Sequence, residues 1–375
     1  MRPLPEEALE TLKRKFEEYY ARKQPPLPPG FAQREFGFGF EKKIDFRHKA
    51  FTSNRDFDYY FKSQAPLYAS YSAAYYSLPG ARPMERKDWL GADLIFDFDE
   101  PRLPKEHYEK EHSALLCPKC LQAILDDTIL LKENYLEADF GFSKKDTLLV
   151  FSGNKGYHCH VRAEAVHDLK QEARRELLEY TKGPKSMLRK VRDGRVKVLR
   201  GPSAQSLGWG KRFYDEAVHA FDSKDALRAY GLREPKISKV FKDKERVLSL
   251  LAKGNWDAFT GMEKAWERVF ESVRAKYALN PDAQVTLDLA RLIRLPDSLH
   301  GGTGLLAATV KHPNFNPLSN AVAFSWRRKE SVRLKKAIIV EMGGETLELR
   351  EGENEVPEAV AVLLEAKGLT VSLMT

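Results

Sequence analysis

Hydrophobic positions recur at two spacings along the chain, and together they predict a mixture of helices and strands. Residues 5–22 carry apolar side chains at helical spacing, and the PPLPPG run that follows ends this helix. Residues 34–51 alternate aromatic and polar side chains, which predicts strands. Further along, the runs at 93–99 and 146–153 predict strands, and residues 121–136 predict a helix.

The middle of the chain has a different pattern. Between residues 166 and 278 most apolar positions recur at helical spacing, around a basic, glycine-punctuated segment at 181–212. Strands are predicted again at 284–295 and 336–341, and a helix is predicted from Pro357. This order of elements predicts a helical insertion in an α/β body.

We therefore predict a mixed α/β (α+β) fold in two parts. Residues 1–165 and 279–375 would form one discontinuous core, a mixed β-sheet flanked by helices, and residues 166–278 a mainly helical insertion. The length of 375 residues allows one large domain or two ordinary ones.

Composition and charge narrow the class of protein. Hydrophobic residues make up 42% and charged residues 31%, which is typical of a soluble globular protein. No apolar run approaches the roughly 20 residues of a membrane span, and MRPLPEEALE lacks the apolar segment of a signal peptide, so we expect a cytoplasmic protein with no membrane partner. The net charge of +8 favours a polyanionic partner, although a basic enzyme that binds no nucleic acid is an ordinary alternative. Three cysteines, two of them in a CxxC, favour metal binding or free thiols over a disulfide framework.

The run LIFDFDE at 94–100 places two aspartates at the end of an apolar strand. Side chains alternate between the faces of a strand, so Asp97 and Asp99 would project from one face with their α-carbons roughly 6 to 7 Å apart. At that separation both carboxylates can reach one divalent cation or a pair of cations. The alternative is a solvent-facing strand end, where aspartate is common.

Two glycine-bearing loops concentrate groups that bind phosphate. In SGNKGYHCHV, at 152–161, the glycines allow a tight turn whose backbone N–H groups can approach a phosphate. Ser152, Lys155 and His158 add donors to this loop, and the alternative is a plain hairpin with a core histidine.

The second loop is RLIRLPDSLHGGTGL at 291–305, and its donors are Arg291, Arg294, Ser298, His300 and Thr303. A solvated basic turn is the alternative. Asp282 stands at the start of the strand predicted to feed this loop, so it would add a third carboxylate to Asp97 and Asp99 if the two strands are neighbours.

The segment HYEKEHSALLCPKC spaces four metal ligands as H-x4-H-x4-C-x2-C, at His107, His112, Cys117 and Cys120. Thiolates and imidazoles in a short loop are the ligands that tetrahedral zinc selects. We therefore predict a structural Zn²⁺ site in the loop at 107–120, with a reduced, metal-free loop as the alternative. No vacant coordination position is implied, so this zinc is not assigned to catalysis.

These elements, in this order, resemble the small, catalytic subunit of the archaeo-eukaryotic DNA primases, of the archaeal type. The resemblance rests on REFGF, YASYSAAYY, ARPMERKDWLGADLIFDFD, the zinc-ligand cluster, SGNKGYHCHV, and DxxVT followed by RLIRLPDSLHGGTGL. These motifs span residues 34 to about 310, and the middle insertion and the tail add little. The resemblance implies a primase-type catalytic core that carries the zinc loop and the helical insertion.

The resemblance also implies roles for individual residues. Asp97 and Asp99 would be the metal-binding pair of the family, and Asp282, in DxxVT, its third catalytic carboxylate, with Asp288 as a lower-ranked rival. The nucleotide-binding set would be Arg47, Ser152, Lys155, His158, Ser298 and His300.

The expected function is template-directed synthesis of short primers on single-stranded DNA, from NTPs or dNTPs, with release of pyrophosphate. Two Mg²⁺ or Mn²⁺ ions on the three carboxylates would support this nucleotidyl transfer. The resemblance implies a heterodimer with a large primase subunit. The alternatives are a primase-like repair or translesion polymerase that extends pre-made ends, a non-catalytic zinc-containing nucleic-acid binding module, and a two-metal nuclease.

Overall fold

The computed structural model describes residues 4–110, 115–193, 196–257 and 261–371. The chain divides into two compact units, one formed by residues 1–129, 143–175 and 281–375 and the other by residues 130–142 and 176–280. Among the described residues, no helix is long and apolar enough to cross a membrane.

The first unit contains most of the strands. Its helices, with two short 3-10 turns, are α1 (Glu6–Tyr20), η1 (Phe31–Gln33), α2 (Asn54–Gln64), η2 (Met84–Lys87), α3 (Lys105–Lys110), most of α4 (Pro118–Leu130), α5 (Glu164–His167), the start of α6 (Gln171–Lys182), α12 (Ala283–Leu287), α13 (Pro317–Asn320) and α14 (Glu358–Ala366). Its strands are β1 (Phe36–Gly39), β2 (Phe46–Lys49), β3 (Tyr68–Ser72), β4 (Ala74–Tyr76), β5 (Trp89–Ala92), β6 (Leu94–Phe98), β7 (Thr147–Phe151), β8 (Tyr157–Val161), β11 (Leu292–Arg294), β12 (Lys329–Leu334), β13 (Ile338–Met342), β14 (Glu345–Leu349), β15 (Gly352–Pro357) and β16 (Thr370–Val371).

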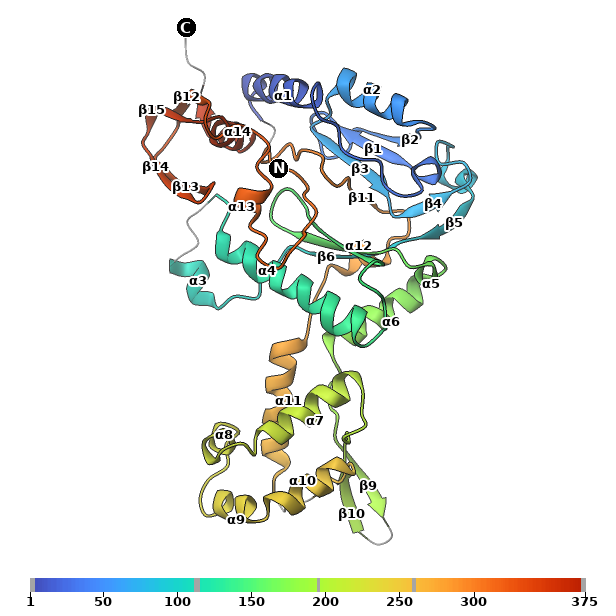
Figure 1. Cartoon of the computed structure of the whole chain (residues 1–375), viewed down its shortest axis with the longest axis vertical. Coiled ribbons are helices and arrows are strands. Elements are labelled where there is room, and N and C mark those ends of the chain that lie inside the picture. Colours follow the sequence, from blue (N-terminus) through green and yellow to red (C-terminus); the bar gives the residue numbers. More distant parts are fainter. Residues whose placement is uncertain (1–3, 111–114, 194–195, 258–260, 372–375) are drawn as a thin grey trace. The chain divides into compact units, whose positions relative to one another are not determined.

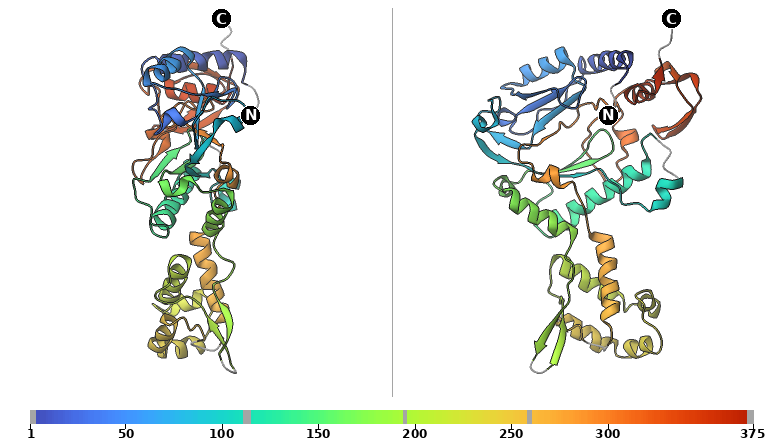
Figure 2. Two further views of the ribbon diagram at one scale, coloured as in Figure 1. Left: turned by 90° about the vertical axis from the view of Figure 1, so that its right-hand side faces the viewer. Right: turned by 180° about the vertical axis from the view of Figure 1, so that it is seen from behind.

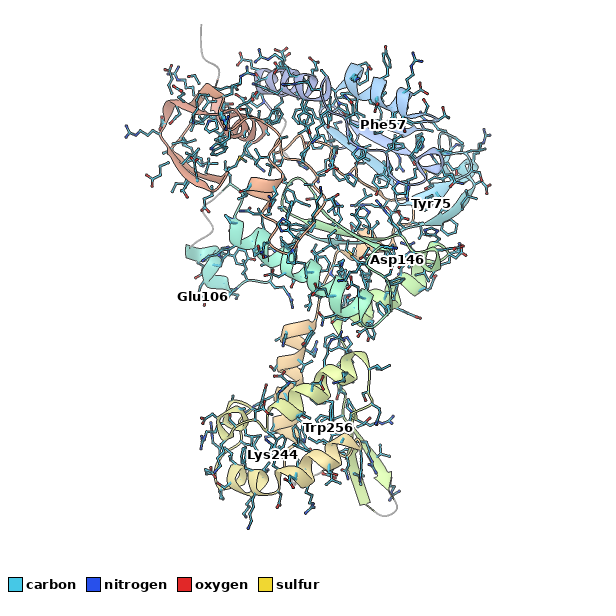
Figure 3. The ribbon with its side chains drawn as sticks, in the orientation of Figure 1. Phe57, Tyr75, Glu106, Asp146, Lys244 and Trp256 are labelled. Carbon is cyan, nitrogen blue, oxygen red and sulfur yellow. The ribbon has the colours of Figure 1, made fainter. Side chains whose placement is uncertain are left out.

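The first sheet of this unit has the strand order β11-β3-β1-β2, and every pair is antiparallel. Helices α1 and α2 lie along one of its faces (Figure 1). Phe16 and Tyr20 of α1 and Phe57 and Phe61 of α2 are buried in one cluster with Phe36 of β1. Phe57, labelled in Figure 3, has its ring centroid 5.7 Å from that of Phe36. The helical spacing of these aromatic residues therefore fixes the helices on the sheet.

A second sheet, with the order β6-β8-β7, carries the acidic strand. Its antiparallel register places Asp97 opposite His158 and Phe98 opposite Tyr157. The end of β6 thus lies beside the turn that precedes β8. Helix α4 runs along this sheet in the views of Figures 1 and 2, and its Leu121 is buried.

The C-terminal strands form two smaller sheets, β15-β12-β16 and the hairpin β13-β14. Helix α14 packs against α1. Lys15 of α1 donates from Nζ to Glu358 Oε1 at 2.8 Å and also pairs with Glu330 of β12. A buried ion pair therefore joins the first helix of the chain to its last one.

The second unit is mainly helical. It consists of the end of α4, the π-helical turn η3 (Leu131–Glu137), the end of α6, β9 (Arg189–Asp193), β10 (Val196–Arg200), α7 (Gly208–His219), α8 (Lys224–Ala229), α9 (Lys236–Lys242), α10 (Lys244–Ala252) and α11 (Glu263–Tyr277). Trp256, labelled in Figure 3, is buried at its centre, stacked on Phe213 at 4.5 Å and edge-on to Trp266 at 5.1 Å.

The mixed α/β fold class is confirmed, as are the helix at 5–22 and the strands within 34–51, 93–99 and 146–153. The strand predicted at 284–295 is wrong for its first half. The Asp282 side chain accepts a hydrogen bond from Gln284 N, which caps the short helix α12, and only Leu292–Arg294 is a strand.

Candidate active site

The three acids expected at the site lie together in the first unit. Asp97 is in β6, Asp99 follows that strand, and Asp282 N donates to Asp97 O at 2.8 Å. Burial, followed by the charges of Asp99 and Asp282, raises the pKa of Asp97 to about 7. A divalent cation bound to these carboxylates would relieve their mutual repulsion.

Asp288, the rival for the third position, caps the other end of α12. Its Oδ1 accepts from Ala290 N at 2.9 Å, and its side chain lines the pocket described below. After burial and Asp99, the charge of Asp282 is the next largest cause of the raised pKa of Asp97. Asp282 therefore belongs to the electrostatic cluster around Asp97 but does not line the pocket, whereas Asp288 lines it.

Arg174 holds the two acid-bearing elements together. It donates from Nη2 to Ala92 O at 3.0 Å and from Nη1 to Asp93 O at 3.0 Å, just before β6. Nη1 also reaches Thr286 O of α12 at 3.5 Å. Burial lowers the pKa of this arginine to about 10, so it stays charged at neutral pH. Sequence reasoning missed Arg174, because one arginine on a helix carries no distinguishing pattern.

The loop before β8 forms one wall of the site. Ser152 N donates to Gly156 O at 2.8 Å and Gly156 N donates to Ser152 Oγ at 3.2 Å, which closes the turn. Lys155 is exposed at its tip, with Nζ 3.7 Å from Asp99 Oδ2. Gly153 has a φ of 84°, and a Cβ there would lie 2.7 Å from the His300 Cβ, so the close approach of the two loops requires glycine.

His158 and His300 face the same pocket as neutral imidazoles. His158 Nε2 lies 3.5 Å from Asp97 Oδ1, and burial, with the charges of Arg294 and Arg291, lowers the pKa of His158 to about 3. Burial and Arg294 also hold the pKa of His300 well below its usual value, and its Nδ1 accepts from Gly302 N at 3.1 Å. Both side chains are therefore hydrogen-bonding groups at neutral pH.

Ser298 lies elsewhere. Its side chain is fully buried, and Oγ donates to Leu295 O at 2.7 Å. It is not among the residues that line the pocket. In this structure it supports the loop that presents His300.

Arg47 is held in place by a carboxylate that sequence reasoning missed. It donates from Nε to Glu35 Oε1 at 2.8 Å and from Nη2 to Glu35 Oε2 at 3.2 Å. Burial alone would raise the pKa of Glu35, but Arg47, the backbone N–H of His48 and Lys87 keep it below its usual value. One signal in the sequence could have revealed this carboxylate. Glu35 stands inside the aromatic run REFGF, and an acid buried there needs a cationic partner.

These walls enclose a pocket of about 360 Å³. Of the predicted residues, its lining includes Arg47, Asp97, Asp99, Ser152, Lys155, His158 and His300. Lys43, Arg291 and Arg294 add further cations. One pocket therefore combines acids that suit divalent cations with bases that suit phosphates.

The predicted zinc ligands also converge. His107 Nε2 lies 3.3 Å from Cys120 Sγ and 3.4 Å from Cys117 Sγ, and the three ligand atoms lie within 4.8 Å of one another. Burial and the neighbouring Cys117 raise the pKa of the Cys120 thiol to about 12. One imidazole and two crowded sulfurs fit a thiophilic cation. His112 lies outside the described residues.

Comparisons with known proteins agree with this arrangement. The model of the DNA primase small subunit family matches residues 96–311. The chain is 34% identical to the DNA primase small subunit of Methanocella arvoryzae, over 95% of this chain and 96% of that protein. It is 34% identical to that of Methanothrix thermoacetophila, over 95% and 97%, and 32% identical to that of Picrophilus torridus, over 93% and 94%.

The chain therefore belongs to the DNA primase small subunit family. This membership confirms the expected class, a nucleotidyltransferase that is the catalytic subunit of a primase. The repair-polymerase and binding-module alternatives are not favoured.

Proposed function

We propose that this chain synthesises primers on single-stranded DNA from nucleoside triphosphates, with Asp97, Asp99 and Asp282 holding Mg²⁺ or Mn²⁺. The observation that carries the proposal is the grouping of Asp97 with Asp99 and Asp282, which together with burial raises the pKa of Asp97, beside a pocket that five Lys and Arg side chains and Asp288 also line. When bound, the cations lower the negative charge of the triphosphate and favour attack of a 3′-hydroxyl at the α-phosphate.

The protein groups position the nucleotide. Arg47, fixed by Glu35, and Lys155, at the tip of its turn, would bind phosphate oxygens as permanent cations. Neutral His158 and His300 would donate hydrogen bonds without holding an extra proton. The tight turn that begins at Ser152 would bring backbone N–H groups toward the same phosphates.

We also propose that His107, Cys117 and Cys120, with His112 as fourth ligand, bind a structural Zn²⁺. Metal analysis of purified protein is the check, and about one zinc per chain is expected, lost on Cys117→Ser. The family name also supports a partnership with a large primase subunit.

The proposed activity is tested by labelled nucleotide incorporation on a primed DNA template with Mg²⁺ or Mn²⁺. Wild type is expected to extend the primer, and the double variant Asp97→Ala, Asp99→Ala is expected to lose all extension while keeping its fold. Wild-type-like extension by the double variant would show that these acids do not hold the catalytic metals.

A further inference from the structure

The β9-β10 hairpin of the second unit carries an unusual density of positive charge. Residues 189–200 contain six Lys or Arg side chains and one acid, Asp193. The two strands pair antiparallel, from Val196 opposite Asp193 to Arg200 opposite Arg189. The hairpin belongs to the second unit, whereas the site residues described above belong to the first.

Two of the five cross-strand pairs set cation against cation. Arg192 lies opposite Lys197, and Arg189 lies opposite Arg200. Like charges directly opposite each other destabilise a β-ladder. The exposed Lys190 pairs with Glu263 at 3.3 Å, but among the acids whose side chains the structure describes, none pairs with Arg189, Arg192 or Lys197. The Arg192–Lys197 pair thus keeps a repulsion that a bound polyanion would relieve.

The base of the hairpin is firmly anchored. Leu199 is buried in the core of the unit, and Trp256 N donates to Leu199 O at 2.9 Å. Trp256 Nε1 donates to Pro202 O at 2.8 Å. Figure 1 shows the two strands extending from this base beside α10. The cations are therefore displayed on a fixed support, which reduces the entropy lost on binding.

We propose that the β9-β10 hairpin is a binding surface for the phosphate backbone of single-stranded template DNA. Side chains alternate between the faces of a strand, so the neighbouring Arg192 and Lys197 project from one face of the ribbon and Arg189 from the other. Unpaired cations on both faces of a β-ribbon complement a polyanion. Arg189, Arg192 and Lys197 would contact phosphates and not bases, so we expect this binding to be independent of DNA sequence. This inference rests on the proposed function, because template-directed synthesis is the activity that requires a single-stranded template.

The experiment compares wild type with the triple variant Arg189→Gln, Arg192→Gln, Lys197→Gln. Binding of a fluorescent single-stranded oligonucleotide is measured by anisotropy over a series of salt concentrations. Each lost phosphate contact makes the negative slope of log K against log salt shallower by about 0.7, so three should reduce its magnitude by about 2 and weaken binding about tenfold or more at low salt.

The matched control is Lys182→Gln, Lys211→Gln, Arg228→Gln in the same unit. It removes the same charge, but from cations that already pair with Glu179, Asp215 and Asp225. The control is expected to keep both affinity and slope. Equal loss in the control and the hairpin variant would overturn the inference, because net charge alone would then explain the binding.

Thermal unfolding separates binding from a structural role. Without DNA, removal of the repulsion in the hairpin variant is expected to leave the Tm unchanged or to raise it. A lower Tm with weaker binding would assign the cations a structural role and overturn the inference. Wild-type affinity with loss of co-purification with the large subunit would also overturn it, in favour of a protein partner.

The primed incorporation assay distinguishes this inference from the proposed function. At saturating template the hairpin variant should still extend a primer, since its active-site residues are unchanged. If wild type bound DNA through the hairpin but incorporated no nucleotide, the proposed function would fail while the binding surface would stand.

Discussion

Asp97 and Arg47 have opposite electrostatic environments in the site. The charge of Arg47 is balanced by buried Glu35, so this guanidinium is fixed before any nucleotide arrives. Asp97 has the opposite environment, because its acidic neighbours raise its pKa to about 7. The pocket therefore holds its phosphate-binding groups in place and leaves its acids in need of a cation.

Substitution can show which of Asp282 and Asp288 is the third catalytic carboxylate. Asp282→Asn keeps the cap of α12, because asparagine also accepts from the backbone N–H, but it removes a charge beside Asp97. Nucleotide incorporation is expected to fall about a hundredfold or more, against less than about tenfold for Asp288→Asn. The reverse order would make Asp288 the third carboxylate.

Arg174 is predicted to be a positioning residue. Arg174→Met leaves the carbonyls of Ala92, Asp93 and Thr286 without this donor, which should lower the free energy of unfolding by about 2–4 kcal/mol. The Mn²⁺ concentration for half-maximal incorporation should rise several-fold, because α12 and β6 lose their common support.

The control for this prediction is Arg175→Met, at the exposed neighbouring position, which should change neither quantity. A less stable Arg174→Met protein with an unchanged Mn²⁺ requirement would show that Arg174 supports the fold and not the metal site.

At the scale of elements, the spacing of hydrophobic residues predicted the helices and strands that depend on local sequence. Period-two alternation identified the acidic strand, and helical spacing identified α1. The short helix α12 was missed because its apolar residues suit a strand equally well, and the cap that favours a helix is a side-chain contact, in which Asp282 accepts from Gln284 N. Contacts such as those of Arg174 and Glu35 join distant segments, so no local pattern reports them.

The packing of α14 on α1 gives a prediction about pH. Burial alone would raise the pKa of Glu358, but Lys15 and Ser325 N hold it below its usual value. Because the folded-state pKa is lower than the unfolded-state value of about 4.3, the stability that this carboxylate contributes is present above that value and is lost as pH falls through the folded-state pKa.

Glu358→Gln should therefore lower the free energy of unfolding by about 1–3 kcal/mol at pH 7, and the difference should shrink below about pH 4. Urea unfolding at a series of pH values measures this. Glu355→Gln, exposed on β15, is the control and should show little change. A difference for Glu358→Gln that stayed constant with pH would contradict the assigned ion pair.

At the scale of the whole molecule, the catalytic groups and the basic hairpin belong to different compact units. The sequence predicted an insertion at 166–278, and the second unit described here comprises residues 130–142 and 176–280. The family model ends at residue 311, whereas the relatives match nearly the full chain. Motifs identified the active-site loops, but the charge arrangement of the hairpin became visible only when the register of its strands was known.

The central claim is that this chain starts primers with Asp97 of β6 and the acids beside it. The most direct measurement is synthesis on a single-stranded DNA template without a primer, using labelled NTPs or dNTPs and Mn²⁺ or Mg²⁺. Wild type is expected to make short products, and Asp97→Asn is expected to make none. Undiminished products from Asp97→Asn, or no wild-type products with or without a large subunit, would contradict the account.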